Sequence, residues 1–373
     1  MVNEHQVAVI KVIGIGGAGN NAVNRMIEAG VQGVEFIVIN TDAQVISASK
    51  AETKLIIGKQ ICGGLGAGAN PDVGRQAAIE SIKEISKLLE NSDMIFIAAG
   101  MGGGTGTGAA NIIAKAAKDL DILVVSIITT PFQFEGKIRN ENAKNGIKLL
   151  KEYIDSLIIV SNDRLLEIIG GVPLKDSFKE ADNILRQGVQ SITDLIAVPA
   201  LINLDFADIK TLLKNQGQAL FGVGIGSGEE KAIEAANKAI TSPLLEADFH
   251  GASSAIVNVT GGATMTLYDA NDAVDIIRQA AGRDINIIFG VSVNENLEDE
   301  MIVTVIATGF EDKNSQQKQK NYKINNFNLS SSKLRNFSNY NYNNHKISTN
   351  NINNQKISNN NNNLLSKATL KFK

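Results

Sequence analysis

The sequence predicts an α/β fold in which a doubly wound parallel sheet is followed by a long central helix and a second, mixed α+β domain. In the first half of the chain, β-branched apolar segments alternate with segments of helical periodicity, as in parallel sheets covered on both faces. Apolar residues then recur every three or four positions from Leu174 to Val198. Beyond Gln218, strand-like segments follow one another with fewer helices between them, which is typical of an α+β domain.

The first half of the chain supplies the elements of the parallel sheet. We expect strands at Val7–Ile15, Phe36–Ile39, Met94–Ala98, Leu123–Ile128 and Leu157–Val160, and helices after the first strand, at Val73–Leu89, from Asn111 and at Glu135–Leu150. Because open parallel sheets bind ligands at the carboxyl ends of their strands, we expect a site at that edge.

The second half begins with the long helix, which Pro199 ends. Its seven or so turns correspond to roughly 35 Å, which suits a connection between two domains. A short helix is expected at Ile209–Lys214. The remaining expected elements are strands at Ala219–Ile225, Ala255–Val259, Ile285–Val293 and Met301–Ala307, and helices at Glu230–Ile240 and Asp272–Ala281.

The most informative stretch is Ala98–Ala110, AAGMGGGTGTGAA, between a buried strand and a helix. Glycine allows several backbone N–H groups to converge, and the first turn of the next helix adds unpaired donors and partial positive charge. The stretch therefore predicts a phosphate-binding loop. It lacks the Lys-Ser or Lys-Thr of a P-loop, so backbone, a metal ion and distant groups must meet the phosphate charge, while Thr105 and Thr107 offer hydroxyls.

Further loops end at the same edge: Gly14–Gly19, the acidic Asn40–Asp42, and the glycine-rich Gly63–Pro71. The spacing of Gly14, Gly16 and Gly19 also matches the dinucleotide fingerprint G-x-G-x-x-G, in which Asp42 would hold a ribose. Three glycine-rich loops offer more donors than one pyrophosphate uses, so a nucleoside triphosphate is the better ligand. A dinucleotide-dependent oxidoreductase is the alternative.

Composition limits the class of protein. The chain has 373 residues, enough for two domains, and one cysteine, Cys62, so no internal disulfide is expected. His5, His250 and His345 are scattered and predict no metal site. No apolar segment approaches the roughly 20 residues of a membrane span, and no leader is evident, so a cytoplasmic protein is expected.

Charge is unevenly distributed. Residues 312–373 contain eleven Lys and Arg, nineteen Asn and one acidic residue, whereas the rest of the chain is acidic. Nucleic-acid binding by the folded part is therefore disfavoured. We expect the tail to be a disordered, solvated segment because it cannot bury enough apolar surface. Contact with an anionic surface is its alternative role.

Five motifs occur in order between Val9 and Gly309. They are IGIGGAGNNAVNRM at 13–26, GLGAGANP at 64–71, GMGGGTGTGAA at 100–110, PFQFEGKIR at 131–139 and NLDFADIK at 203–210. Together they resemble the FtsZ family of tubulin-like bacterial division GTPases. The resemblance implies GTP/GDP binding, Mg²⁺ with K⁺ as a possible second cation, hydrolysis to GDP and phosphate, and head-to-tail polymerisation into the cytoplasmic ring at mid-cell.

The resemblance also implies roles for individual residues. Binding of the α- and β-phosphates falls to Gly16, Gly17, Gly102, Gly103, Gly104, Thr105, Gly106 and Thr107. Sensing of the γ-phosphate and Mg²⁺ falls to Asp42, Ala67, Gly68 and Ala69. Contacts to the ribose, phosphates and nucleoside fall to Glu135, Arg139, Asn20, Asn21 and Asn162. Without the resemblance, Glu135 and Arg139 would be interpreted as a surface ion pair.

The resemblance places the long helix beside the base. There Asp182 can accept from N1–H and N2–H₂ of guanine, a donor pair that adenine lacks, and Phe178 can stack on the ring. It also identifies Asn203, Asp205 and Asp208 with the family's catalytic loop, inserted into the site of the neighbouring subunit, where the carboxylates act on the attacking water. From its position alone, Asp208 is more simply a helix cap.

These inferences divide the chain into a nucleotide-binding domain at 1–173, a connecting helix at 174–199, an α+β domain with the catalytic loop at 200–311, and a basic Asn-rich tail at 312–373. The tail departs from the family, because Leu364–Lys373 has no clear counterpart of its terminal acidic-to-basic peptide with a central proline. Division proteins are expected to bind there, so any membrane contact is indirect. The motifs also allow a tubulin-like plasmid-partition GTPase or a GTP-regulated binding module without turnover.

Overall fold

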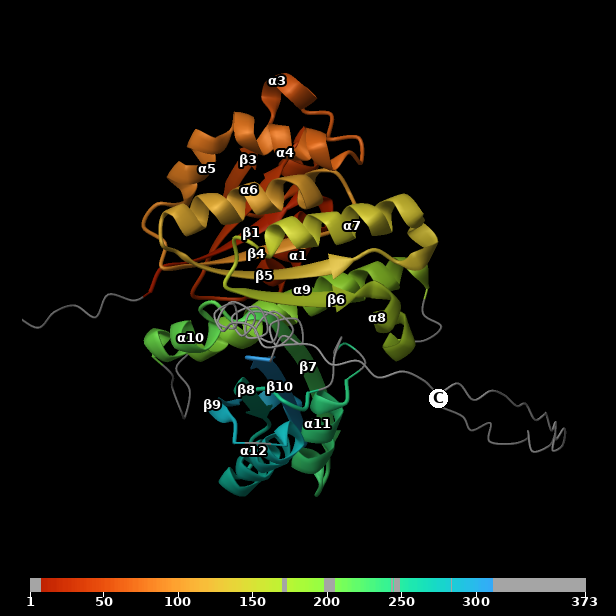
Figure 1. The fold of residues 1–373 in the computed structure, drawn as a ribbon. Coiled ribbons are helices and arrows are strands. Elements are labelled where there is room, and N and C mark those ends of the chain that lie inside the picture. The colour runs from red at the N-terminus through yellow and green to blue at the C-terminus, as the bar shows by residue number, and fades with distance from the viewer. Residues whose placement is uncertain are drawn as a thin grey trace, which may run out of the picture. The chain divides into compact units, whose positions relative to one another are not determined.

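The computed structural model describes residues 8–169, 173–197, 205–242, 244, 249–282 and 284–310 (Figure 1). Predictions for Pro199, Asn203 and the tail at 312–373 lie outside these ranges.

Six parallel strands form the first part of the sheet. Their spatial order is β3 (Thr53–Ile56), β2 (Glu35–Asn40), β1 (Ile10–Ile15), β4 (Met94–Gly100), β5 (Leu123–Thr130) and β6 (Ser156–Ser161). Strands β2 and β4 lie on either side of β1, so the chain direction across the sheet reverses between β1 and β4. The predicted doubly wound sheet is confirmed, and the expected ligand position is this reversal point. Strand β3 is additional to the prediction.

Helices cover both faces of this sheet, because successive side chains of each buried strand point to opposite sides. Val12 and Phe96 pack on one side in the cluster that includes α1 (Gly16–Glu28) and α9 (Leu174–Ala197). Ile13 and Ile95 pack on the other. The helices on that second side are α4 (Pro71–Glu80), α5 (Ile82–Leu89), α6 (Thr105–Asp119) and α7 (Lys137–Leu150).

Two predicted helices are wrong in extent. The helix expected at Val73–Leu89 is interrupted at Ser81, whose Oγ accepts a hydrogen bond from the Gly58 backbone N–H at 3.2 Å. The helix expected from Glu135 begins only at Lys137, because Gly136 has φ +100° and ends a 3₁₀ turn, η1 (Gln133–Glu135). Short helices not predicted are α2 (Ala43–Ala48), α3 (Lys59–Cys62) and α8 (Asn162–Ile169).

The C-terminal part is a mixed sheet, as predicted. Its order is β7 (Gly217–Ser227), β10 (Glu300–Thr308), β8 (Ser254–Gly261) and β9 (Asn286–Val293), with α11 (Lys231–Ile240) and α12 (Leu267–Ala281) packed on it. Strand β10 is antiparallel to β7 and β8, whereas β8 and β9 are parallel. The first residues of β7 pair in parallel with β6, so both sheets form one continuous ladder. Helix α10 (Phe206–Leu213) precedes β7, and the turn η2 (Glu295–Leu297) precedes β10.

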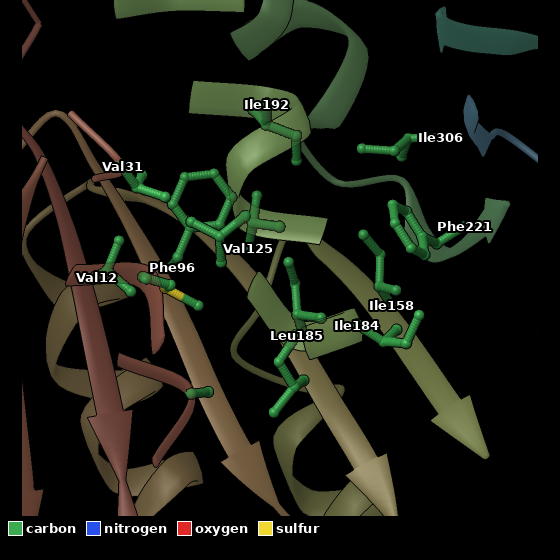
Figure 2. Close-up of a cluster of buried hydrophobic side chains, with 14 of the residues drawn as sticks. Val12, Val31, Phe96, Val125, Ile158, Ile184, Leu185, Ile192, Phe221 and Ile306 are labelled. Atoms are coloured by element: carbon green, nitrogen blue, oxygen red, sulfur yellow. The ribbon is translucent and has the colours of Figure 1, made fainter. Parts of the chain in front are cut away.

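Helix α9 lies between the two parts of the sheet. Its side chains Ile184, Leu185 and Ile192 belong to the same buried cluster as the strand residues of the first sheet and as Phe221 and Ile306 of the second (Figure 2). Each such aliphatic side chain contributes about 1.5–3 kcal/mol on burial. The helix therefore holds the two parts together through a shared core.

Gly108 sets the separation of α4 and α6. A Cβ at this position would lie 2.0 Å from the carbonyl oxygen of Pro71 and 2.6 Å from the backbone nitrogen of Arg75. No side chain fits between the two helices there.

We predict that Gly108→Ala destabilises the protein by about 1–3 kcal/mol, because the added methyl group must push two backbones apart. Urea unfolding of the nucleotide-free protein measures this. Gly17→Ala is the matched control, since a Cβ at Gly17 has no atom within 4 Å. Equal unfolding midpoints for the two variants would contradict the packing argument.

Candidate functional site

A cavity of about 340 Å³ lies at the carboxyl ends of β1, β4 and β5. Predicted site residues lining it are Gly16, Gly17, Gly103, Gly104, Thr105, Gly106, Glu135, Arg139, Asn162, Phe178 and Asp182. The structure thus brings these predicted residues together from separate stretches of the chain.

Two helices begin at this cavity without a side-chain cap. The N-cap positions of α1 and α6 are Ile15 and Gly104, and neither makes a capping hydrogen bond. By contrast, Asn70 and Thr266 cap α4 and α12 with their side chains. The first N–H groups of α1 and α6 are therefore available to an anion, and each helix adds about half a positive charge.

Because glycine has no Cβ, the loops that precede α1 and α6 can approach each other closely. A Cβ on Gly16, which has φ +71°, would lie 2.9 Å from the backbone nitrogen of Gly106. A Cβ on Gly106 would lie 2.6 Å from the carbonyl oxygen of Gly100. Glycine at both positions therefore brings the N-termini of α1 and α6 to one point.

The two threonines have different positions. Thr105 lines the cavity, and its buried hydroxyl lies 2.7 Å from that of Thr41 at the end of β2. Thr107 is not in the cavity wall, and its Oγ1 accepts from the Gly102 N–H at 2.8 Å. Thr107 thus fixes the loop, whereas Thr105 faces the ligand space.

One end of the cavity suits a flat ring. Phe178 is 42% exposed although it belongs to a helix with a buried face, and its ring meets that of Phe132 edge to face at 5.2 Å. Oδ1 of Asn162 is buried and has no hydrogen-bond partner among the described residues. A planar base could stack on the exposed ring of Phe178.

Asp182 also lines this end, where its side chain is 13% exposed. Burial raises its pKa to about 6, although a hydrogen bond and the charge of Arg25 on α1 act in the opposite direction. The Arg25 Nε to Asp182 Oδ2 distance is 3.3 Å. The carboxyl group is therefore mostly ionised at pH 7, which is about one unit above its pKa.

Glu135 and Arg139 face the cavity as an ion pair with a 2.6 Å Oε2 to Nη1 distance. Glu135 also accepts from the Phe132 N–H at 3.0 Å, which fixes the turn before α7. Because Arg139 is already paired and no lysine of the described ranges lines the cavity, backbone N–H groups must carry most of the contact to phosphates.

Several predicted residues lie outside the cavity wall: Asn20, Asn21, Asp42, Ala67, Gly68, Ala69, Gly102 and Thr107. Asp42 caps α2 by accepting from the Gln44 and Val45 N–H groups at 2.8 and 3.3 Å. Asn20 is buried, with its amide positioned to donate to the carbonyl oxygens of Gly14 and Gly16. Asn21 is exposed. These residues support or adjoin the loops, and their roles toward the nucleotide stay predictions.

The dinucleotide alternative fails at Asp42, the residue that would hold the ribose, because Asp42 caps α2 and lies outside the cavity wall. Gly14 and Gly19 do not decide between the two ligands, because close packing is also the role of the first and third glycines of the dinucleotide fingerprint. A Cβ on Gly14 would lie 2.4 Å from the Gly19 carbonyl oxygen, and one on Gly19 would lie 2.2 Å from that of Ala98. These glycines pack α1 against β1 and β4, and Asp42 caps a helix.

The predicted catalytic carboxylates lie elsewhere. Asp205 and Asp208 are exposed, and Asp205 is the N-cap residue of α10 but makes no side-chain capping bond. The interpretation of Asp208 as a helix cap is wrong, because Asp208 lies inside the first turn. At the other end of α10, the Leu213 carbonyl accepts from Ser156 Oγ at the start of β6, at 2.7 Å. The cavity lies at the carboxyl ends of the strands, so α10 contacts the opposite edge of the sheet.

Sequence reasoning missed some residues of the wall: Ala18, Gly100, Met101, Thr129, Pro131 and Ala181. Thr129 and Pro131 lie at the end of β5 and just after it, so the rule that ligands bind at carboxyl ends could have found them. Ala18, Gly100 and Met101 were not named individually but lie within the predicted loops Gly14–Gly19 and Ala98–Ala110, whereas Ala181 is a small apolar side chain that carries no chemical signal.

A second cavity of about 640 Å³ lies between α9 and the C-terminal strands, and includes Arg186, Asp194 and Asn258. Although it is larger, its described lining contains none of the predicted site residues and none of the glycine-rich phosphate loops. The smaller cavity has the donors that phosphates require.

Comparison with known proteins agrees with this geometry. The Tubulin/FtsZ family GTPase domain matches residues 9–170, and the FtsZ family C-terminal domain matches residues 217–311. An FtsZ dimer from M. jannaschii is 41% identical, with a TM-score of 0.78 over 82% of this chain and 89% of that one. A tryptophan-to-tyrosine mutant of the M. jannaschii protein is 42% identical, with a TM-score of 0.79 over 82% and 92%.

A more distant structure shares the fold. CetZ2 from Haloferax volcanii, a GTPγS-bound protofilament, is 19% identical, with a TM-score of 0.68 over 86% of this chain and 99% of that one.

The fold and the cavity define a tubulin-type GTPase that binds GTP and GDP. The matches to both domains and the identity to the M. jannaschii protein show that this chain belongs to the FtsZ family. Among the described residues, no helix has the length and apolar character needed to cross a bilayer.

If Asp182 has its predicted role as the acceptor for the base, GDP affinity should fall as pH decreases through about 6, because protonation of Asp182 removes that acceptor. At one pH unit below the pKa, about a tenth of the carboxyl groups remain ionised, so the Kd should rise about tenfold. Calorimetric titration with GDP measures this. In Asp182→Asn the pH dependence of binding reports titration of the phosphates alone. If this variant and the wild type had identical pH profiles, the assignment of Asp182 as the acceptor for the base would be contradicted.

Proposed function

We propose that the chain hydrolyses GTP in head-to-tail filaments, in which Asp205 and Asp208 of one subunit complete the nucleotide site of the next. The observation that carries the proposal is the separation of the two half-sites. The carboxylates belong to a helix that contacts the edge of the sheet opposite the cavity, as the Leu213 to Ser156 hydrogen bond indicates. Neither carboxylate lines the cavity of its own chain, which supports a role toward the nucleotide of a neighbouring chain.

This separation determines the kind of assembly. Contact between two different surfaces of one chain is heterologous, and without closure it generates an open filament. The related structures, an FtsZ dimer and a CetZ2 protofilament, are assemblies of those proteins. The exposure of Asp205 and Asp208 and the missing cap bond at Asp205 support the same arrangement here.

The chemistry follows from the positions of these groups. The N–H groups of α1 and α6 hold the phosphates, and the carboxylates of the neighbouring subunit orient a water molecule and accept its proton. The water oxygen attacks the γ-phosphorus while the bond to the β–γ bridging oxygen breaks, which yields GDP and phosphate. Mg²⁺ would bind phosphate oxygens, water and one or two carboxylates. The described residues of one chain contain no cluster of three metal-ligating side chains.

We propose further that these filaments form the cytoplasmic ring that marks and constricts the division site. The basis is membership of the FtsZ family over both folded domains. Partner proteins would bind the C-terminal tail. A role in plasmid partition requires the same enzymology, so the position of the labelled protein in dividing cells distinguishes the two: a mid-cell ring supports division, and movement with a plasmid contradicts it.

Asp205→Asn is predicted to bind GTP normally and to lose turnover by about a hundredfold or more, because it keeps the fold but cannot accept a proton. Phosphate release and nucleotide binding are measured separately. Normal turnover in the variant would contradict the role of Asp205.

Mixing two variants with defects in different half-sites tests the shared site more directly. Asp182→Asn should bind GTP poorly but still offer intact carboxylates, so adding it to Asp205→Asn should restore part of the turnover. No restoration, although the two variants co-assemble, would contradict shared sites.

Asp182→Asn is also predicted to exchange base preference. An amide can donate to O2 of xanthine, where guanine has an amino group, so binding of xanthosine diphosphate should strengthen while that of GDP weakens by about tenfold or more. Competition binding with both nucleotides measures the ratio. An unchanged preference would exclude Asp182 as the base reader.

A further inference from the structure

Asp182 has a charged neighbour that the proposed chemistry does not use. Arg25, in the last turn of α1, donates through Nε to Oδ2 of Asp182 at 3.3 Å. The two residues are 157 positions apart in the sequence, and their side chains are 32% and 13% exposed. The pair is therefore a tertiary contact between α1 and α9 in a partly buried setting.

Other charged groups belong to the elements around this carboxylate. Glu135 and Arg139, on η1 and α7, line the same cavity but are paired with each other at 2.6 Å. On α9 itself, Arg186 bonds to Asn183 and Gln190. Lys179 and Glu180 are further charged groups of α9, and Asp163, Arg164 and Glu167 are those of the neighbouring helix α8. Arg25 alone among them acts on the pKa of Asp182.

We propose that Arg25 is a positioning and specificity-determining residue for guanine, which holds the Asp182 carboxylate so that its remaining acceptor sites face the base. This inference rests on the proposed role of Asp182 as the base reader.

Recognition of guanine depends on how many acceptors the carboxyl group offers. Guanine presents N1–H and N2–H₂ on one edge, and an ionised carboxylate can accept from both. A protonated carboxyl group would present an O–H to this edge and lose one of the two bonds. Only Oδ2 is engaged by Arg25, and Oδ1 has no hydrogen bond within the described ranges. The contact thus stabilises the charge, occupies one acceptor site of Oδ2 and leaves Oδ1 and the second site of Oδ2 for the base.

Burial and Arg25 act in opposite directions on the pKa of Asp182, so Arg25 is needed to keep the carboxyl group ionised. Burial raises the pKa of Asp182, and Arg25 is the group that opposes it. An opposite charge at this range typically lowers a carboxyl pKa by about 1–3 units. Without the guanidinium, the carboxyl group would titrate near or above neutral pH.

The test compares GDP binding from about pH 5 to about pH 9 for the full-length wild type, Arg25→Met, Arg25→Lys and Glu28→Gln. Arg25→Met keeps the stem but not the charge, and we expect the pH midpoint for binding to rise by about one unit or more. At pH 7 a rise of one to two units corresponds to roughly twofold to tenfold weaker binding, and at pH 9 the affinity should return to within about twofold of the wild type. Arg25→Lys should keep the midpoint within about half a unit.

Glu28→Gln is the matched control, since it removes an exposed charge from the same helix. An unchanged midpoint in Arg25→Met would overturn the inference, and so would a loss of affinity that is equal at every pH, because that indicates structural damage. A midpoint in Arg25→Lys displaced as far as in Arg25→Met would do the same. If Asp182→Asn bound GDP like the wild type, the proposed base reader itself would fail, which separates that failure from a failure of Arg25 alone.

Discussion

The site depends on the close approach of backbones at the reversal point of the sheet. Gly16 against Gly106, and Gly19 against Ala98, leave no room for a Cβ, so α1 and α6 begin at one place with unpaired N–H groups. Anion binding then needs no lysine, because the donors and the helix dipoles are fixed by the fold. Arg139, the one cationic side chain among the described residues of the cavity wall, can remain paired with Glu135.

Helix α9 connects this anion site to the rest of the molecule. One part of it presents Phe178 and Asp182 to the cavity, while Ile192 and Leu195 share a buried cluster with residues of both sheet parts. A change in the position of the base would therefore act on a helix that also packs on the C-terminal domain. The proposed catalytic loop follows this helix in the chain and belongs to the proposed contact with the next subunit. Helix α9 could therefore transmit a change in the bound nucleotide to the contact between subunits.

The sequence predicted what local patterns encode. Continuous β-branched segments such as Ile10–Ile15 predicted buried parallel strands, and the run around Gly104 predicted the phosphate loop. Three features depended on context that no local pattern contains. The break at Gly136 follows from one positive φ value, the burial of Asp182 depends on α1, and its partner Arg25 lies 157 residues away. Asp208 resembled a cap because Asp favours helix starts, whereas the structure places it inside the first turn and leaves it exposed.

The central claim is that neither half-site acts alone. GTP turnover per molecule, measured with Mg²⁺ and K⁺ over a range of protein concentrations while light scattering is recorded, tests it most directly. Shared sites predict no turnover below a threshold concentration, and turnover that rises together with scattering above it. Turnover per molecule that is independent of concentration would contradict the claim, since a complete site would then exist within one chain.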